Sequence, residues 1–182
     1  MVMFISGGAR SGKSSFAEKK ALSVFSELKP LNQNVQLRYI ATAKRSDNEM
    51  KQRIRFHEQQ RSNDWQTIEA PYEISKVLRN ASNGDVILMD CLTIWLSNMI
   101  FDLHYTSERL LEAVNEWFEI AKNKQLHLII VSNDLNEGFP HFDEFVNDYI
   151  HDLETLHQNI VKKAEYAIQV IAGLPTYWKG ER

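Results

Sequence analysis

Short apolar runs alternate along the chain with longer segments in which side chains recur at helical spacing. The first run, Val2–Ser6, is stopped by two glycines, as expected for a buried strand. The next segment, Lys13–Leu28, places side chains four apart, from Phe16 to Leu28, on one face of a helix that Pro30 ends. By the same criteria we predict further strands at 35–41, 65–70, 85–90, 126–132 and 166–173, and helices at 46–61, 72–80, 92–101, 107–123 and 142–165.

This alternation of strands and helices is typical of a parallel sheet that is covered by helices on both faces and built with right-handed crossovers. The length of 182 residues matches one domain. We therefore predict an α/β protein with a mainly parallel sheet, in a single domain over residues 1–182.

Composition and charge exclude several classes of protein. The net charge of −3 gives no basic stripe of the kind that nucleic-acid binders carry. The lone cysteine, Cys91, excludes an intrachain disulfide and a cysteine-cluster metal site. We find neither a signal peptide nor an apolar run near the ~20 residues that span a bilayer. These features predict a soluble cytoplasmic protein with no nucleic-acid partner.

The stretch between the first strand and the first helix carries the clearest chemistry. Gly7, Gly12, Lys13 and Ser14 satisfy the pattern G-x-x-x-x-G-K-[ST]. Its glycines let backbone N–H groups surround phosphate oxygens, and the lysine reaches the β- and γ-phosphates. A plain glycine-rich turn is the alternative, and the motif does not distinguish a kinase from a GTPase or a motor. The predicted nucleotide-binding loop of this P-loop NTPase-like fold consists of Gly7, Gly8, Ala9, Arg10, Ser11, Gly12, Lys13 and Ser14.

A magnesium site is predicted beside this loop. Ser14 supplies a hydroxyl, and Asp90 ends the buried run "VILMD", where an acidic residue holds Mg²⁺ through water. The alternative role for Asp90 is to cap the following helix.

Three blocks in this order resemble the adenosylcobinamide kinase / adenosylcobinamide-phosphate guanylyltransferase family of cobalamin assembly. They are "GGARSGKSSFAE", "YIATAKRSDNEMKQRIRFHEQQRSNDWQTIEAP" and "DCLTIWLSN", and the resemblance is dense from residue 4 to about 98. It implies phosphorylation of adenosylcobinamide by a nucleoside triphosphate, ATP or GTP, with Mg²⁺. It also implies GMP transfer from GTP to the resulting phosphate through a guanylylated histidine, and a homo-oligomer, a trimer, as the assembly.

His57 matches the guanylylated histidine of that family. A neutral imidazole is nucleophilic near pH 7. On the predicted helix 46–61, Arg53, His57 and Arg61 fall on one face, and arginines suit an anionic triphosphate. The resemblance thus implies that Lys13 and His57 are catalytic and that Arg53 and Arg61 help to bind the nucleotide.

The resemblance weakens in the C-terminal half. Asn133 matches the family, but Asp134 replaces a glutamate and Asn136 a glycine, while Gly138 keeps its glycine. The family segment Arg-x-Phe-Arg-Asp corresponds to residues 147–151, which read "NDYIH", and Glu154 and His157-Gln158 stand where the family has Gly and Asn-Gln. Two alternatives therefore stay open beside the bifunctional enzyme, namely a nucleotide-binding protein without this catalysis and a monofunctional P-loop kinase.

Overall fold

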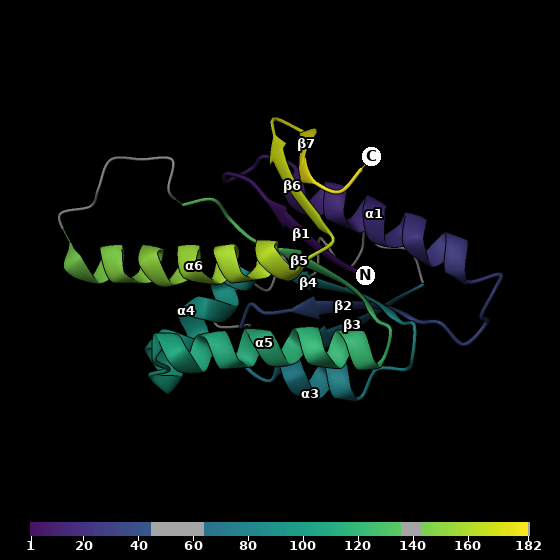
Figure 1. Ribbon diagram of the computed structural model, residues 1–182, viewed down its shortest axis with the longest axis horizontal. Helices are drawn as coiled ribbons and strands as arrows, with labels where there is room; N and C mark the ends of the chain where they lie inside the picture. Colours follow the sequence, from purple (N-terminus) through teal and green to yellow (C-terminus); the bar gives the residue numbers. More distant parts are fainter. Residues whose placement is uncertain (45–63, 136–142, 182) are drawn as a thin grey trace.

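The computed structural model describes residues 1–44, 64–135 and 143–181. A seven-stranded sheet runs through them in the order β3-β2-β4-β5-β1-β6-β7 (Figure 1). Its strands are β1 Val2–Ser6, β2 Leu37–Ala41, β3 Trp65–Glu69, β4 Val86–Asp90, β5 His127–Val131, β6 Tyr166–Ile171 and β7 Leu174–Lys179. The helices are α1 Lys13–Leu28, α3 Ile74–Arg79, α4 Leu92–Leu103, α5 Ser107–Asn123 and α6 Glu144–Lys163.

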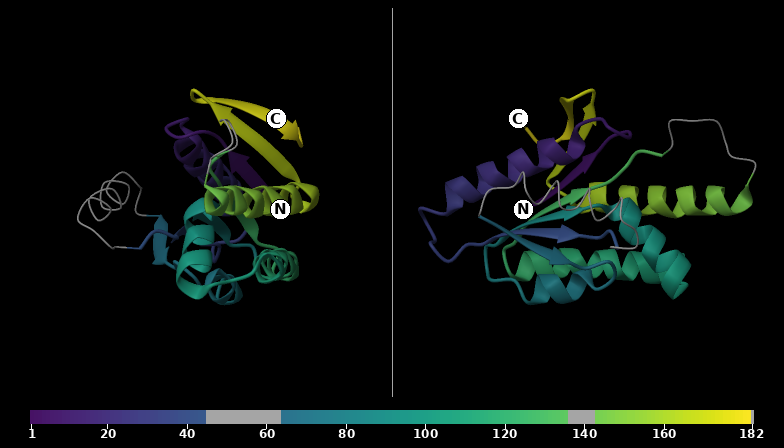
Figure 2. Two further views of the ribbon diagram at one scale, coloured as in Figure 1. Left: turned by 90° about the vertical axis from the view of Figure 1, so that its left-hand side faces the viewer. Right: turned by 180° about the vertical axis from the view of Figure 1, so that it is seen from behind.

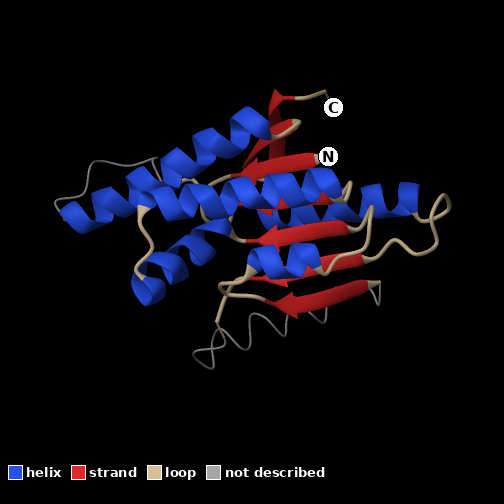
Figure 3. Ribbon diagram, turned by 60° about the horizontal axis from the view of Figure 1, so that its bottom comes forward, coloured by secondary structure: helices blue, strands red, loops and turns tan. Residues whose placement is uncertain are grey.

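Helices cover both faces of the sheet (Figure 3), which confirms the predicted fold class. Alternate residues of β1 show why. Phe4 joins the core formed with α3, α4, α5 and α6, and Ile5 joins the core formed with α1. Both side chains are buried, and a strand buried on both faces reads as the continuous apolar run seen in the sequence.

The predicted elements agree with the structure to within a few residues where the structure describes them. The bounds of β1, α1 and α5 are as expected. Helix α4 runs two residues further than predicted, to Leu103, and ends at His104, which adopts the left-handed conformation with φ 52°. The predicted helix 46–61 lies outside the described residues.

The last part of the sheet differs from the prediction. The run 166–173, expected to be a single final strand, ends at Ile171, and β7 returns antiparallel to it (Figure 2). The two residues between the strands, Ala172 and Gly173, both have positive φ, at 49° and 83°. A two-residue hairpin turn of this kind usually begins with Asn, Asp or Gly, so the Ala172-Gly173 pair did not signal it. Pro175 within β7 is tolerated because β7 is an edge strand.

Candidate nucleotide-binding site

The loop 7–14 joins β1 to α1 in a conformation that its glycines make possible. A Cβ on Gly7 would lie 2.4 Å from the carbonyl oxygen of Val170 and 2.6 Å from the Ser11 Oγ, so no other residue fits there. Gly12, the residue before α1, has φ 89°, in the region that favours glycine. Arg10 adopts φ 58° in the same turn. The chain is therefore wound tightly enough to present successive backbone N–H groups at the start of the helix.

The interior of this loop offers charge and hydrogen bonds to an anion. Lys13 is 8% exposed, and its Nζ donates to the carbonyl oxygen of Gly8 at 3.1 Å. The buried Ser11 Oγ has no hydrogen-bond partner among the described residues. The first N–H groups of α1 add the positive end of a helix dipole. An ammonium, an unpaired hydroxyl and a helix N-terminus together fit a phosphate chain.

Asp90 lies at the same edge of the sheet as the loop. It ends β4, which is separated from β1 by β5 alone, and all three strands run parallel. At a strand spacing of about 4.8 Å, β4 is roughly 10 Å from β1. The Asp90 Oδ2 accepts a hydrogen bond from the Tyr39 hydroxyl at 2.9 Å, which fixes the direction of the carboxylate.

The donor set at this edge fits Mg²⁺. The hydroxyl of Ser14, in the first turn of α1, and the carboxylate of Asp90 are hard oxygen ligands. Magnesium usually takes one or two protein oxygens and completes its shell with phosphates and water. The described part of the chain contains no group of three or more acidic, histidine or cysteine side chains that could hold a metal by itself.

The pKa of the Cys91 thiol is influenced both by Asp90 and by Lys13 of the loop. Burial, and after it the Asp90 carboxylate, raise the pKa of this thiol to about 12, while the Lys13 ammonium acts in the opposite direction. Asp90 and Lys13 therefore both lie within electrostatic reach of one thiol. A thiol with such a pKa is not a nucleophile at neutral pH.

Asp134, which follows β5, is hydrogen-bonded to the start of loop 7–14. Its backbone N–H donates to the carbonyl oxygen of Gly7 at 3.1 Å, and its Oδ2 accepts from the Ser6 hydroxyl at 3.3 Å and from the Gln169 amide at 3.0 Å. The sequence showed Asp134 only as a replacement for a family glutamate. Nothing local in the sequence indicates that three strands converge on this carboxylate.

The altered segment contributes the half-buried His157 to a polar cluster behind the site. His157, on α6, shares a hydrogen bond with the Ser132 hydroxyl at 2.7 Å, and Ser132 is paired with the Thr93 hydroxyl at 3.2 Å. Burial lowers the pKa of His157 to about 4, with Asp134 opposing the shift, so the ring is neutral at pH 7. His157, which replaces a family asparagine, therefore holds α6 to Ser132, the residue that follows β5.

Three predicted site residues, Arg53, His57 and Arg61, lie outside the described residues, as do Asn136 and Gly138. Their roles stay predictions. The predicted loop residues and Asp90 lie at the same edge of the sheet, and their roles in binding are likewise predictions.

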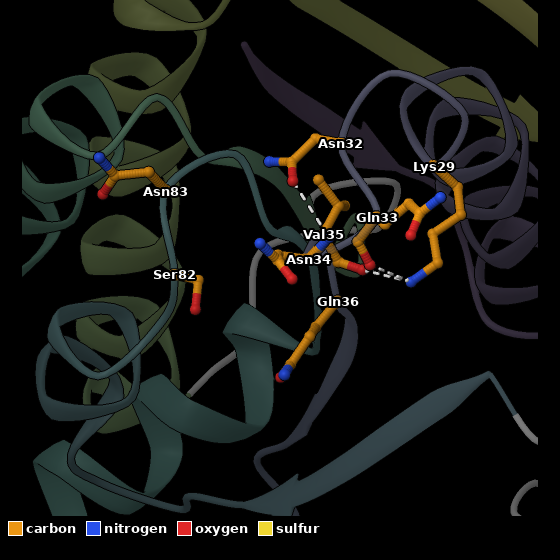
Figure 4. A pocket seen from close by; sticks show the side chains of 8 residues that line it. All are labelled: Lys29, Asn32, Gln33, Asn34, Val35, Gln36, Ser82 and Asn83. Carbon is orange, nitrogen blue, oxygen red and sulfur yellow. Dashed lines mark hydrogen bonds between the residues drawn. The ribbon is translucent and has the colours of Figure 1, made fainter.

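A hollow at the opposite edge of the sheet holds no comparable chemistry. It lies between the loop that follows α1 and the turn before β4 (Figure 4). The Lys29 Nζ there donates to the carbonyl oxygens of Gln33 and Val35, at 2.8 and 3.1 Å. Its lining is mostly amide and hydroxyl side chains, from Asn32, Gln33, Asn34, Gln36, Ser82 and Asn83. We assign it no role in the chemistry at the loop.

The fold and the loop together define a P-loop nucleotide-binding protein. The flagellar accessory protein FlaH from Methanocaldococcus jannaschii has a similar fold, with a TM-score of 0.53 over 99% of this chain and 78% of FlaH at 15% identity. Among the helices described here, none is long and apolar enough to cross a membrane.

The chain belongs to the cobinamide kinase / cobinamide phosphate guanyltransferase family, whose model matches residues 3–177. It is 36% identical to the bifunctional adenosylcobalamin biosynthesis protein CobP of Pseudomonas aeruginosa over 97% of this chain and 96% of that protein. It is 24% identical to the bifunctional adenosylcobalamin biosynthesis protein CobU of Salmonella typhimurium over 96% of this chain and 97% of that protein. The match spans the C-terminal half, including the segment in which individual family residues are replaced.

Proposed function

We propose that this protein phosphorylates adenosylcobinamide and then transfers GMP from GTP to the adenosylcobinamide phosphate, in cobalamin biosynthesis. The single observation that carries the proposal is the family match over residues 3–177. The glycine-rich loop before α1, with Gly12 in the left-handed conformation, supports it. The 36% identity to CobP over nearly the full length supports both reactions in one chain.

In the kinase step, the acceptor hydroxyl oxygen of the cobinamide attacks the γ-phosphorus of the triphosphate. An O–P bond to the acceptor forms, the bond to the β-phosphate oxygen breaks, and the hydroxyl proton is lost. The Lys13 ammonium and the N–H groups of the loop stabilise the charge that develops on the phosphate oxygens. Ser14 and Asp90 would hold Mg²⁺, which neutralises charge on the β- and γ-phosphates when bound.

In the transfer step, a neutral ring nitrogen of His57 attacks the α-phosphorus of GTP, and pyrophosphate leaves. The phosphate of the phosphorylated cobinamide then attacks the same phosphorus, and the N–P bond breaks to regenerate the imidazole. The histidine thus divides one phosphoryl exchange into two in-line displacements. Arg53 and Arg61 would bind the triphosphate from one face of the helix that the sequence predicts at 46–61.

The experiment that tests the proposal is incubation with labelled GTP and Mg²⁺, followed by mass spectrometry of the protein. We expect one GMP adduct, on His57, which survives base and is lost in acid because it is a phosphoramidate. His57→Ala should abolish GMP transfer and leave phosphorylation of adenosylcobinamide largely intact. Adduct formation should fail as the pH drops below the imidazole pKa, about 6.5 if unperturbed.

A matched control is His151→Ala, which removes an exposed histidine from α6 and should leave the adduct in place. An adduct on His151 or His157 would contradict the assignment of His57. An active kinase without any adduct would instead support a monofunctional kinase, which the replaced residues at 134–158 favour as the second candidate.

We also propose a homotrimer as the assembly, from the family resemblance stated above. Light scattering of the purified protein tests this, with a mass of three chains expected and a monomer contradicting it.

A further inference from the structure

The turn of the β6–β7 hairpin touches the phosphate-binding loop. The backbone N–H of Gly173 donates to the carbonyl oxygen of Ser11 at 2.8 Å. A Cβ built on Gly12 would lie 3.4 Å from the Gly173 Cα. The hairpin that the sequence failed to indicate therefore forms a wall of the loop region, held to it by backbone contacts.

The hairpin and Asp90 lie on opposite sides of the loop. From β1, the sheet continues through β5 to β4 and Asp90 in one direction, and through β6 to β7 in the other (Figure 1). A triphosphate whose terminal phosphates lie at Lys13 and face Asp90 extends its nucleoside end away from Asp90. That direction leads to the hairpin turn.

The hairpin presents an apolar pair at this point. Ile171 and Leu174 pair directly across the turn, so their side chains share one face of the hairpin. They are 57% and 74% exposed, although most aliphatic side chains of the sheet are fully buried. A base has two flat apolar faces, and aliphatic side chains beside a phosphate site can cover one of them.

We propose that Ile171 and Leu174 form a platform that binds the nucleobase of the triphosphate held in loop 7–14. The proposal rests on the proposed function, because it assumes that this loop binds the phosphates. Aliphatic side chains contact the face of a ring and leave its hydrogen-bonding edge free. The platform therefore strengthens binding of ATP and GTP alike and does not select between them.

The test compares ligands with and without a base. Calorimetry in the presence of Mg²⁺ measures the affinity of the full chain for ATP, for GTP and for inorganic tripolyphosphate. We expect Leu174→Ser and Ile171→Thr each to weaken the binding of both nucleotides about tenfold, because apolar area is no longer buried. Their affinity for tripolyphosphate should equal that of the wild type.

Leu31→Ser is the matched control, since Leu31 is an 84% exposed leucine in the loop after α1, and it should change neither affinity. Unchanged nucleotide affinity in both hairpin variants, with tripolyphosphate bound normally, overturns the platform alone. Failure of the wild type to bind tripolyphosphate overturns the phosphate site and the platform with it. A changed oligomeric state in Leu174→Ser with unchanged nucleotide affinity would show that the pair is a subunit contact, which also overturns the proposal.

Discussion

The two edges of the sheet, one at the amino ends and one at the carboxyl ends of the parallel strands, use their polar side chains in different ways. At the edge formed by the amino ends of the parallel strands, here called the amino edge, Asp85 is fully buried. It accepts hydrogen bonds from the Gln36 N–H, the Arg38 Nε and the Ser82 N–H, each at 2.9 Å. At the carboxyl edge, among the described residues, the Ser11 hydroxyl has no partner and Lys13 donates to one loop carbonyl. A polar group whose bonds are all satisfied within the chain stabilises the fold, whereas one left with unused capacity in a tight loop is available to a ligand.

The largest expected effect is a loss of stability on substitution of Asp85, the fully hydrogen-bonded carboxylate at the amino edge. Asp85→Ala removes the carboxylate that pairs with the Arg38 guanidinium, whose side chain is 10% exposed and keeps, among the described residues, only the neutral Gln36 Oε1 as a side-chain partner. Breaking such a buried pair from one side costs about 3–5 kcal/mol of unfolding free energy. Urea denaturation measures this loss. Glu73→Ala, which breaks the exposed Glu73–Lys76 pair, is the control and should cost less than about 1 kcal/mol. Equal losses in the two variants would refute the structural role of Asp85.

His157 extends the comparison, because it lies behind the carboxyl edge and its Nε2 is hydrogen-bonded within the chain, to the Ser132 hydroxyl. Burial lowers its pKa to about 4, whereas an unfolded histidine titrates near 6.5. Between these pH values the unfolded chain binds a proton that the folded chain does not. The free energy of unfolding therefore falls as the pH drops from about 6.5 to about 4, by up to about 3 kcal/mol.

Urea denaturation of the wild type and His157→Gln over this pH range tests that contribution. The variant should lose less stability on acidification, because glutamine does not take up the proton. His151→Gln, at an exposed position of α6, should keep the slope of the wild type. Identical slopes for the wild type and His157→Gln would mean that the pKa of His157 is not lowered in the folded chain.

Lys13→Ala should affect binding and leave the fold stable. Its ammonium donates to one carbonyl in the loop, and a triphosphate would lose its main cation. We expect a loss of about 2–3 kcal/mol, on the order of a hundredfold in affinity for ATP or GTP. Calorimetry measures it, with thermal melting as the check on folding. Lys29→Ala, at the amino edge, removes a lysine whose carbonyl contacts are local and should leave affinity unchanged. Unchanged nucleotide affinity in Lys13→Ala would refute the assignment of loop 7–14 as the phosphate-binding site.

Asp90→Asn should give the smallest change and should act mainly on turnover. The metal charge that Asp90 would hold matters most when charge develops in the transition state. We expect kcat of the kinase step to fall about tenfold and nucleotide affinity to fall less than about threefold. Steady-state kinetics separates these effects. Asp148→Asn, at an exposed position of α6, should alter neither. Full turnover in Asp90→Asn would refute the metal-holding role of Asp90, and capping of α4 would not replace that role, because the N-cap residue is Cys91 and no side chain caps the helix.

Elements with strong local signals were predicted well. The apolar run of β1, the glycines of the loop and the periodicity of α1 lie within 28 consecutive residues, and their bounds in the structure are as expected. The β6–β7 hairpin was not predicted, because its turn begins with Ala172 and alanine is not typical of such turns. Helix 46–61, with His57 on it, lies outside the described residues and stays a prediction.

The sequence by itself determined the α/β alternation, the phosphate-binding loop and the acidic end of β4, because each depends on residues close together in the chain. Only the tertiary structure decided the neighbours of that loop. The contact of Gly173 with Ser11 and the bond between Asp134 and Ser6 join residues more than a hundred positions apart. Such contacts follow from the order of strands in the sheet, with β5 on one side of β1 and β6 on the other. Strand order is set by how both faces are buried together, and no local pattern of side chains encodes it.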